Sequence, residues 1–140
     1  MRLYGKDIKV DTLSPLTLAF TGDAVFSMYI REMLVCEANR PVGQLHKLSV
    51  NWVKAEAQSK GMHAILSLLT EKETEVFKRG RNAHTSHTPK NQSGCDYHYA
   101  TGFETLVGYL YLKDETDRLN QLLNEVIKAI EVDGSEKASV

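Results

Sequence analysis

Two carboxylates stand where the neighbouring residues are apolar at helical spacing. Asp23 lies on a mostly apolar face formed by Leu16, Ala19, Phe20, Phe26, Ser27, Ile30 and Leu34. Glu104 shares a face with Ala100, Val107, Gly108 and Tyr111. Burying an unpaired carboxylate is costly, so each acid needs a proton or a cation. Two such acids from two nearly apolar helices could together bind a hard divalent cation such as Mg²⁺.

The same two acids allow a second interpretation. Each could pair with a core Arg, Lys or Tyr, or lie at the edge of a crevice in contact with water. Gly22, next to Asp23, weakens a helix by about 1 kcal/mol relative to alanine. That cost is explained if another backbone or a ligand comes close, and Gly102 lies similarly near Glu104. The periodicity alone leaves both interpretations open.

A basic segment without acids lies between the two carboxylates. No Asp or Glu occurs between Glu75 and Asp96, whereas this segment contains Lys78, Arg79, Arg81, Lys90, His84 and His87. The net charge of the chain is −1, so the positive charge is a local patch. Such a patch suits the phosphates of a nucleic acid. A solvated charged loop is the alternative.

The elements that must position these residues are helical nearly throughout. Ser14 and Pro15 predict a helix start, and the apolar run continues to Val35. A second helix is predicted from Val42 to Lys60, ended by Gly61, and a short apolar helix over 63–69. Thr70 to Glu73 form a capping box, and that helix should stop at Gly80.

The second half begins with a polar segment from Arg81 to about Tyr97, which predicts a loop. Helix resumes near His98 and runs to Leu112. Asp114 is predicted to cap a last helix with an apolar stripe that ends at Ile130. With no strand pattern and no linker, the prediction is an all-α helical bundle. A single domain spans residues 1–130, and residues 131–140 form a flexible tail.

Composition restricts the class of protein further. The 140 residues suit one domain, and no apolar run approaches the roughly 20 residues that span a bilayer. The N-terminal residues carry charges without an apolar core, so they do not form a secretory signal. Cys36 and Cys95 are too few for a disulfide scaffold. We expect a cytoplasmic protein with reduced thiols and no membrane contact.

Four motifs together resemble the ribonuclease III catalytic domain. Residues 18–25, LAFTGDAV, resemble the signature helix of that family, and residues 102–112, GFETLVGYLYL, resemble its second acidic helix. Between them, KRGRNA at 78–83 and TPKN at 88–91 look like motifs of the Mini-ribonuclease III branch. Order and spacing agree from about Leu13 to Leu123.

The resemblance implies an all-α endonuclease that acts as a homodimer on double-stranded RNA with Mg²⁺. Asp23 and Glu104 match the family's essential metal-binding acids. The branch lacks a separate RNA-binding domain and is associated with maturation of large-subunit (23S) ribosomal RNA, where a ribosomal protein could assist. The candidate RNA contacts are Lys78, Arg79, Arg81, Asn82, Lys90 and Asn91, and the apolar residues expected at the dimer seam are Phe20, Phe26, Met28, Tyr29 and Met33.

Two departures from full-length ribonuclease III concern the acids. That family carries a glutamate and an aspartate where this chain has Ala19 and Thr101. The Mini-ribonuclease III branch also lacks them, so the number of metals is open and Thr101 could contribute a hydroxyl. One alternative is a catalytically silent protein that binds RNA in ribosome assembly. Another is a zinc module built from His84, His87, Cys95 and His98.

Overall fold

The computed structural model describes residues 1–83 and 94–138, with side chains of the last helix placed as far as Glu131. All regular elements in these ranges are helical, and no strand occurs in them. This confirms the predicted all-α class. The elements are a 3₁₀ turn at Val10–Thr12, α1 (Pro15–Glu37), α2 (Val42–Val53), α3 (Ala55–Ile65), a 3₁₀ turn at Leu66–Leu68, α4 (Glu71–Arg81), α5 (Gly94–Leu112) and α6 (Thr116–Ala138).

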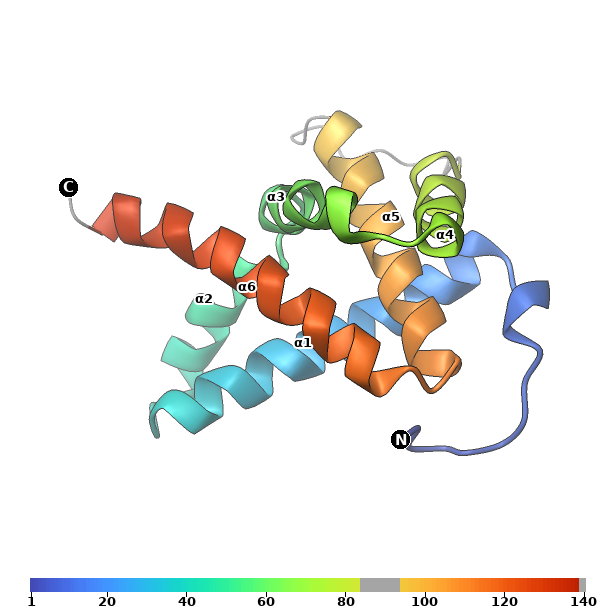
Figure 1. Ribbon diagram of the computed structural model, residues 1–140. Coiled ribbons are helices and arrows are strands. Elements are labelled where there is room, and N and C mark those ends of the chain that lie inside the picture. The colour runs from blue at the N-terminus through green and yellow to red at the C-terminus, as the bar shows by residue number, and fades with distance from the viewer. Residues whose placement is uncertain (84–93, 139–140) are drawn as a thin grey trace.

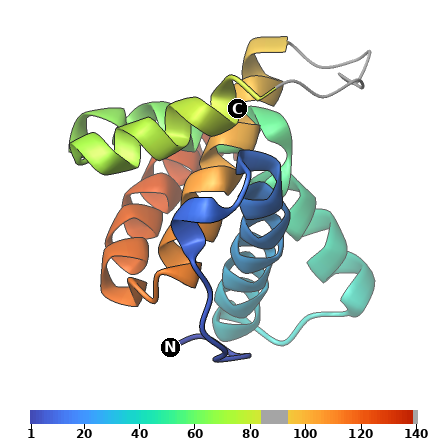
Figure 2. The same ribbon diagram turned by 90° about the vertical axis from the view of Figure 1, so that its right-hand side faces the viewer.

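Helix α5 is the central element of the fold. Figure 1 shows α3 and α4 on opposite sides of it while α1 crosses it, and Figure 2 shows the same arrangement from the side. The stretch Ala100–Leu110 is buried at every position except Glu104, which is half-buried. At the crossing, the rings of Phe26 and Phe103 meet edge to face with centroids 5.0 Å apart. The central helix therefore carries one carboxylate within an otherwise buried stretch.

Two helix starts predicted from capping residues are confirmed. The Ser14 hydroxyl accepts a hydrogen bond from the Thr17 amide at 3.3 Å, ahead of Pro15. At α4, the Glu73 amide donates to Thr70 Oγ1 at 3.1 Å and the Thr70 amide donates to Glu73 Oε1 at 2.9 Å. These side chains satisfy backbone donors that have no partner within the helix.

The prediction of one helix over 42–60 is wrong, because two helices meet at Lys54. This residue is extended, with ψ of 153°, and it ends α2 and begins α3. The side-chain Nε2 of Gln58 donates a hydrogen bond to the Val53 carbonyl at 3.0 Å and satisfies an acceptor that the break exposes. Gly61 does not end a helix either. A Cβ there would lie 2.5 Å from Val126 Cγ1, so this glycine lets α3 and α6 approach closely.

Four further boundaries differ from the sequence prediction. The segment 63–69 is the end of α3 followed by a 3₁₀ turn, and α5 begins at Gly94 rather than near His98. Asp114 does not cap α6 but lies in the preceding turn, with φ of 60°. Helix α6 continues past Ile130 to Ala138, where a tail was predicted, and the flexibility of 131–140 stays a prediction. None of the helices in the described ranges is long and apolar enough to cross a membrane.

Candidate functional site

Two glycines bring the backbones of α1 and α5 into direct contact. A Cβ on Gly22 would lie 1.8 Å from the Glu104 carbonyl oxygen, and a Cβ on Gly108 would lie 2.0 Å from the Leu18 carbonyl oxygen. No side chain larger than hydrogen fits at either position without moving backbone atoms. Gly22 therefore allows the backbone of α5 to come close to α1, as its place in the sequence suggested. This contact places Asp23, the next residue, beside Glu104.

Asp23 and Glu104 come together at this crossing, but not as two buried acids. The buried face of α1 consists of Leu18, Ala19, Gly22, Phe26, Ile30 and Leu34. Leu16 and Phe20, which the sequence placed on that face, are exposed, and Asp23 is exposed as well. The prediction that Asp23 lies in the middle of the buried face is wrong, because the face is centred one residue earlier, on Gly22. Glu104 is half-buried, as its apolar surroundings suggested.

The two carboxyl groups interact directly. Burial raises the pKa of the Glu104 carboxyl to about 8, and a hydrogen bond with the Asp23 carboxyl and its like charge act in the same direction. No Lys or Arg forms an ion pair with either acid in the described part of the chain. A core cation therefore does not explain these acids. A pair of carboxyls that retains a proton near neutral pH is suited to exchanging that proton for a metal ion.

The donor set at the pair suits a hydrated Mg²⁺ ion. Mg²⁺ usually keeps several waters and takes one or two carboxylates together with substrate phosphates. Among residues 1–83 and 94–131, no group of three or more His, Cys, Asp or Glu side chains could hold a metal. A zinc or calcium cage built only of such protein ligands is thus not found there, whereas two oxygen ligands with one solvent-exposed side fit Mg²⁺.

Ala19 and Thr101, which occupy the two positions where full-length ribonuclease III has acids, both make contacts within the helical bundle. Ala19 is buried against the core of the bundle. The Thr101 hydroxyl donates a hydrogen bond to the Tyr97 carbonyl at 3.0 Å, one turn earlier on α5. Its proton is therefore engaged within its own helix, and any contact of this oxygen with a metal stays a prediction.

The predicted RNA-binding residues begin at the C-terminal end of α4. Lys78 and Arg79 are exposed there, Arg81 is half-buried, and Arg81 Nε donates to Asn82 Oδ1 at 3.1 Å. Lys90 and Asn91 lie outside the described residues, as do His84 and His87 of the zinc alternative. The structure therefore groups four of the six candidate RNA contacts at the end of α4, and the described residues do not test the zinc alternative.

Sequence reasoning missed an aromatic cluster beside these basic residues. Tyr99 stacks on His63 with ring centroids 4.1 Å apart and contacts Phe77 at 5.3 Å. The Arg81 guanidinium lies over the Phe77 ring, 5.7 Å from its centroid. The run Tyr97-His98-Tyr99 is the sequence signal, but the predicted loop reached Tyr97, and no packing partner was predicted for Tyr99 at the start of the helix.

Comparison with known proteins connects this geometry to a family. Residues 16–115 match the family model described as Ribonuclease III domain. The chain belongs to the ribonuclease III family. It is 49% identical over 120 residues to the Mini-ribonuclease 3 of a Thermoanaerobacter strain, covering 86% of this chain and 84% of the relative. It is 44% identical over 120 residues to the Mini-ribonuclease 3 of Clostridium tetani, covering 85% and 80%.

A solved structure agrees with this assignment. A crystal structure of a protein from Fusobacterium nucleatum superposes with a TM-score of 0.75 at 30% identity, covering 82% of this chain and 88% of that one. The family match includes both Asp23 and Glu104. This ribonuclease III family member is an endoribonuclease.

Proposed function

We propose that this enzyme cleaves double-stranded RNA with Mg²⁺ held between Asp23 and Glu104. The observation that carries the proposal is the contact of these two carboxyls at the α1–α5 crossing, where the pKa of Glu104 is raised to about 8 and no Lys or Arg of the described residues forms an ion pair with either group. Asp23 and Glu104 are then the metal ligands and catalytic residues.

Each carboxylate has a distinct task in this mechanism. Glu104, on the buried central helix, fixes the position of the ion and gives up its proton when the ion enters. Asp23, on the exposed side of α1, completes the pair and leaves the solvent side open to water and an RNA phosphate. When bound, Mg²⁺ activates a water molecule for attack on phosphorus and offsets charge on the phosphoryl oxygens.

We further propose that the enzyme is a homodimer joined along α1. Phe20 is 83% exposed and Met28 is 60% exposed, and Val35 continues the same exposed apolar side of the helix. These side chains favour a partner surface. Of the other residues expected at the seam, Phe26 is fully buried in the core, and the Tyr29 hydroxyl donates to Asn124 Oδ1 at 3.0 Å. Met33 packs against the core as well.

A two-fold axis gives the dimer one carboxylate pair for each RNA strand. Lys78, Arg79, Arg81, Asn82, Lys90 and Asn91 are proposed to contact the duplex backbone, because A-form RNA is recognised mainly through phosphates and 2′-hydroxyls. We also propose, from the sequence resemblance to the Mini-ribonuclease III branch, that the substrate is precursor large-subunit (23S) ribosomal RNA in the cytoplasm and that a ribosomal protein is a further partner. A catalytically silent RNA-binding protein is the alternative.

A cleavage assay separates these two functions. Purified enzyme and a duplex RNA are combined with Mg²⁺, with Ca²⁺ or with a chelator. We expect Mg²⁺-dependent cleavage that falls by orders of magnitude in Asp23→Asn and Glu104→Gln, because each change removes ligand charge at nearly constant volume. Glu125→Gln, which alters an acid on α6 that pairs with Lys128, is the matched control. RNA binding without cleavage by the wild type would favour the silent protein.

A further inference from the structure

Helix α2 has an exposed basic side that neither the carboxylate pair nor the core uses. No residue of α2 is fully buried, and the side that packs against the core consists of Leu45, Leu48, Trp52 and Val53. The opposite side carries four exposed residues at helical spacing, which are Gln44, Lys47, Asn51 and, at the end of the helix, Lys54. We call these four residues the α2 stripe.

The stripe carries positive charge that the described part of the protein leaves unpaired. The sequence has no Asp or Glu between Glu37 and Glu56. Glu37 pairs with Arg40 at 3.6 Å, whereas neither Lys47 nor Lys54 forms an ion pair with a described residue. Two lysines and two amides without an acid among them suit the phosphates and hydroxyls of a nucleic acid backbone.

Helix α2 lies on the side of α1 that carries Asp23. Asp23 and Leu34 are eleven residues apart, which is close to three full turns, so they share one side of α1 about 16 Å apart along its axis. Leu34 lines the groove between the two helices together with Val42 and Leu45 of α2. Helix α2 and its stripe therefore stand three turns beyond the carboxylate pair on this side.

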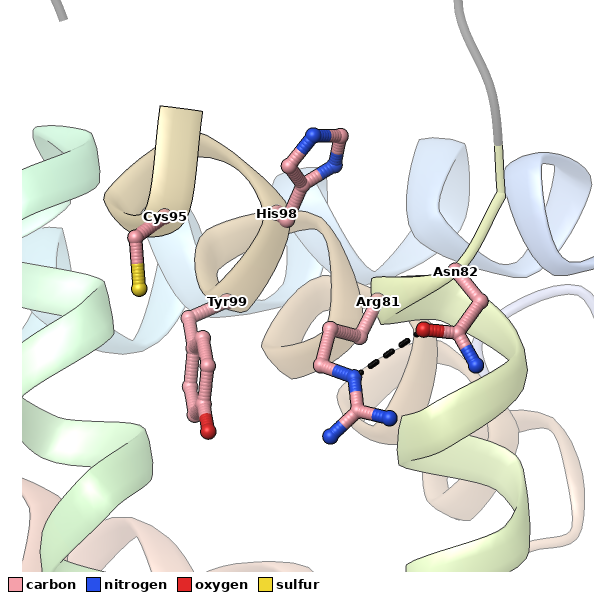
Figure 3. A pocket seen from close by; sticks show the side chains of 5 residues that line it. All are labelled: Arg81, Asn82, Cys95, His98 and Tyr99. Carbon is pink, nitrogen blue, oxygen red and sulfur yellow. Dashed lines mark hydrogen bonds between the residues drawn. The ribbon is translucent and has the colours of Figure 1, made fainter. Parts of the chain in front are cut away.

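The basic end of α4 lies at the opposite end of α1. A Cβ on Gly80 would overlap the Thr105 hydroxyl, which donates to the Pro15 carbonyl at the start of α1 at 3.2 Å. Figure 3 shows that the His98 ring extends away from the Arg81 guanidinium, so the arginine supplies the charge there. Figure 1 shows α2 and α4 at opposite ends of the molecule, with α1 extending from one toward the other.

Two backbone contacts on either side of the carboxylate pair would fix the direction of an RNA duplex. A duplex held only at the end of α4 can pivot, because contacts made at one point define no axis. Phosphate contacts at separate points fix the register and orientation of a nucleic acid on a protein. A-form RNA also displays its 2′-hydroxyls on a wide, shallow minor groove, where amide side chains can reach them.

We propose that the α2 stripe is a second contact for duplex RNA, on the side of Asp23 that is opposite to the end of α4. Lys47 and Lys54 contact phosphates, while Gln44 and Asn51 bond phosphate or 2′-hydroxyl oxygens. This inference rests on the proposed function and extends it, because none of the six expected RNA contacts lies on α2. The stripe aligns the duplex and takes no part in the cleavage step.

The first test removes the two charges of the stripe. Duplex-RNA affinity is measured with Ca²⁺ over a salt series for the double variant Lys47→Gln with Lys54→Gln. The control, Lys6→Gln with Lys9→Gln, removes equal charge from the exposed N-terminal segment. We expect the slope of log affinity against log salt to fall by about two units in the α2 variant, because two phosphate contacts are lost. The control should keep the wild-type slope, and so should Lys47→Arg with Lys54→Arg. An unchanged slope in the α2 variant, or an equal fall in the control, would overturn the proposal.

The second test adds a negative charge to the stripe at nearly constant volume. Asn51→Asp places a carboxylate between the two lysines, and Asn120→Asp, at an exposed position of α6, is the matched control. We expect Asn51→Asp to weaken duplex affinity about threefold to tenfold at low salt and to approach the wild type at high salt, because salt screens the repulsion. Equal affinities of the two variants at low salt would show that no phosphate comes near the stripe.

Sedimentation and cleavage distinguish the remaining outcomes. If the wild type is a dimer and Lys47→Gln with Lys54→Gln is a monomer, the stripe contacts a second copy of the chain and the proposal is wrong. Wild-type cleavage that is lost in Glu104→Gln, with an unchanged salt slope in the α2 variant, would overturn the stripe and leave the proposed function standing. Binding without cleavage by the wild type, with the expected fall in slope, would do the reverse. A wild type that binds no duplex RNA would overturn both.

Discussion

In the proposed mechanism, Glu104 connects the chemistry of the site to pH, because its carboxyl holds a proton that the metal ion would have to displace. Burial is the main cause of its raised pKa, and the Asp23 carboxyl adds to it. The unfolded chain would lose this proton near 4.5 and the folded chain near 8. Between these values the folded state binds more protons, so without metal its stability falls as pH rises.

Divalent-cation binding should therefore strengthen as pH rises from about 6.5 to about 8.5. Below the pKa of Glu104, each pH unit costs up to about tenfold in apparent affinity, because one proton competes with the ion. Titration calorimetry with Ca²⁺ across this range measures the effect. Glu104→Gln should bind weakly with little pH dependence, and a flat profile in the wild type would contradict proton displacement at Glu104.

At the scale of elements, the α1–α5 crossing positions both acids. Gly22→Ala should lower the free energy of unfolding by at least about 2 kcal/mol, because the new methyl group meets the Glu104 carbonyl backbone. Gly43→Ala in α2 is the control: nothing lies within 4 Å of a Cβ there, and the change should stabilise by up to about 1 kcal/mol. Urea unfolding of both variants measures this. Equal stabilities would show that the two helices are not in close contact.

The N-terminal turn of α4 is held to α6 by a second long-range contact. Arg118 Nη2 and Nε donate to the two carboxylate oxygens of Glu73 at 2.8 and 2.9 Å, and Nη2 also donates to the Leu68 carbonyl. The Glu73 side chain is only 7% exposed, and the Arg118 hydrogen bonds are the main reason that its pKa is lowered. The pair therefore fixes the start of the helix that carries the basic residues.

Removing Arg118 should cost about 2–3 kcal/mol, because it leaves a buried carboxylate without its cation. Arg118→Met keeps much of the apolar stem and isolates the loss of charge and hydrogen bonds. Lys128→Met, which breaks an exposed ion pair with Glu125, should change stability by less than about 0.5 kcal/mol. Thermal unfolding at neutral pH compares the two, and similar losses in both variants would rule out a special role for Arg118.

At the scale of the whole molecule, local signals in the sequence were sufficient for part of the fold. The Ser14 cap and the Thr70 capping box are formed by neighbouring residues, so their helix starts were predictable. The break at Lys54 is a single extended residue, after which the Gln58 side chain satisfies the exposed Val53 carbonyl, and Gly61 contacts Val126 in a distant helix. Neither a one-residue break nor a contact with a distant helix leaves a periodic signal in the sequence.

The site was predictable to a similar extent. The occurrence of Asp23 and Glu104 in two apolar helices indicated one shared site, and the structure brings the two carboxyl groups together. The exposure of Asp23 was missed, because the buried face of α1 is set by the backbone contact at Gly22 rather than by the widest apolar stripe. Phe20 and Met28 widen that stripe but are exposed. The surplus of apolar residues on α1 is therefore the sequence feature on which the proposed dimer surface rests.

The central claim is that each subunit of a dimer cuts one strand through its own Asp23–Glu104 pair. The most direct measurement uses mixed dimers of one wild-type and one Glu104→Gln subunit, isolated through two different tags, acting on a duplex RNA labelled on both strands. We expect the mixed dimers to nick a single strand per cut site in the presence of Mg²⁺, whereas wild-type dimers should cut both strands. Mixed dimers that still cut both strands, or wild-type protein that is active as a monomer, would contradict it.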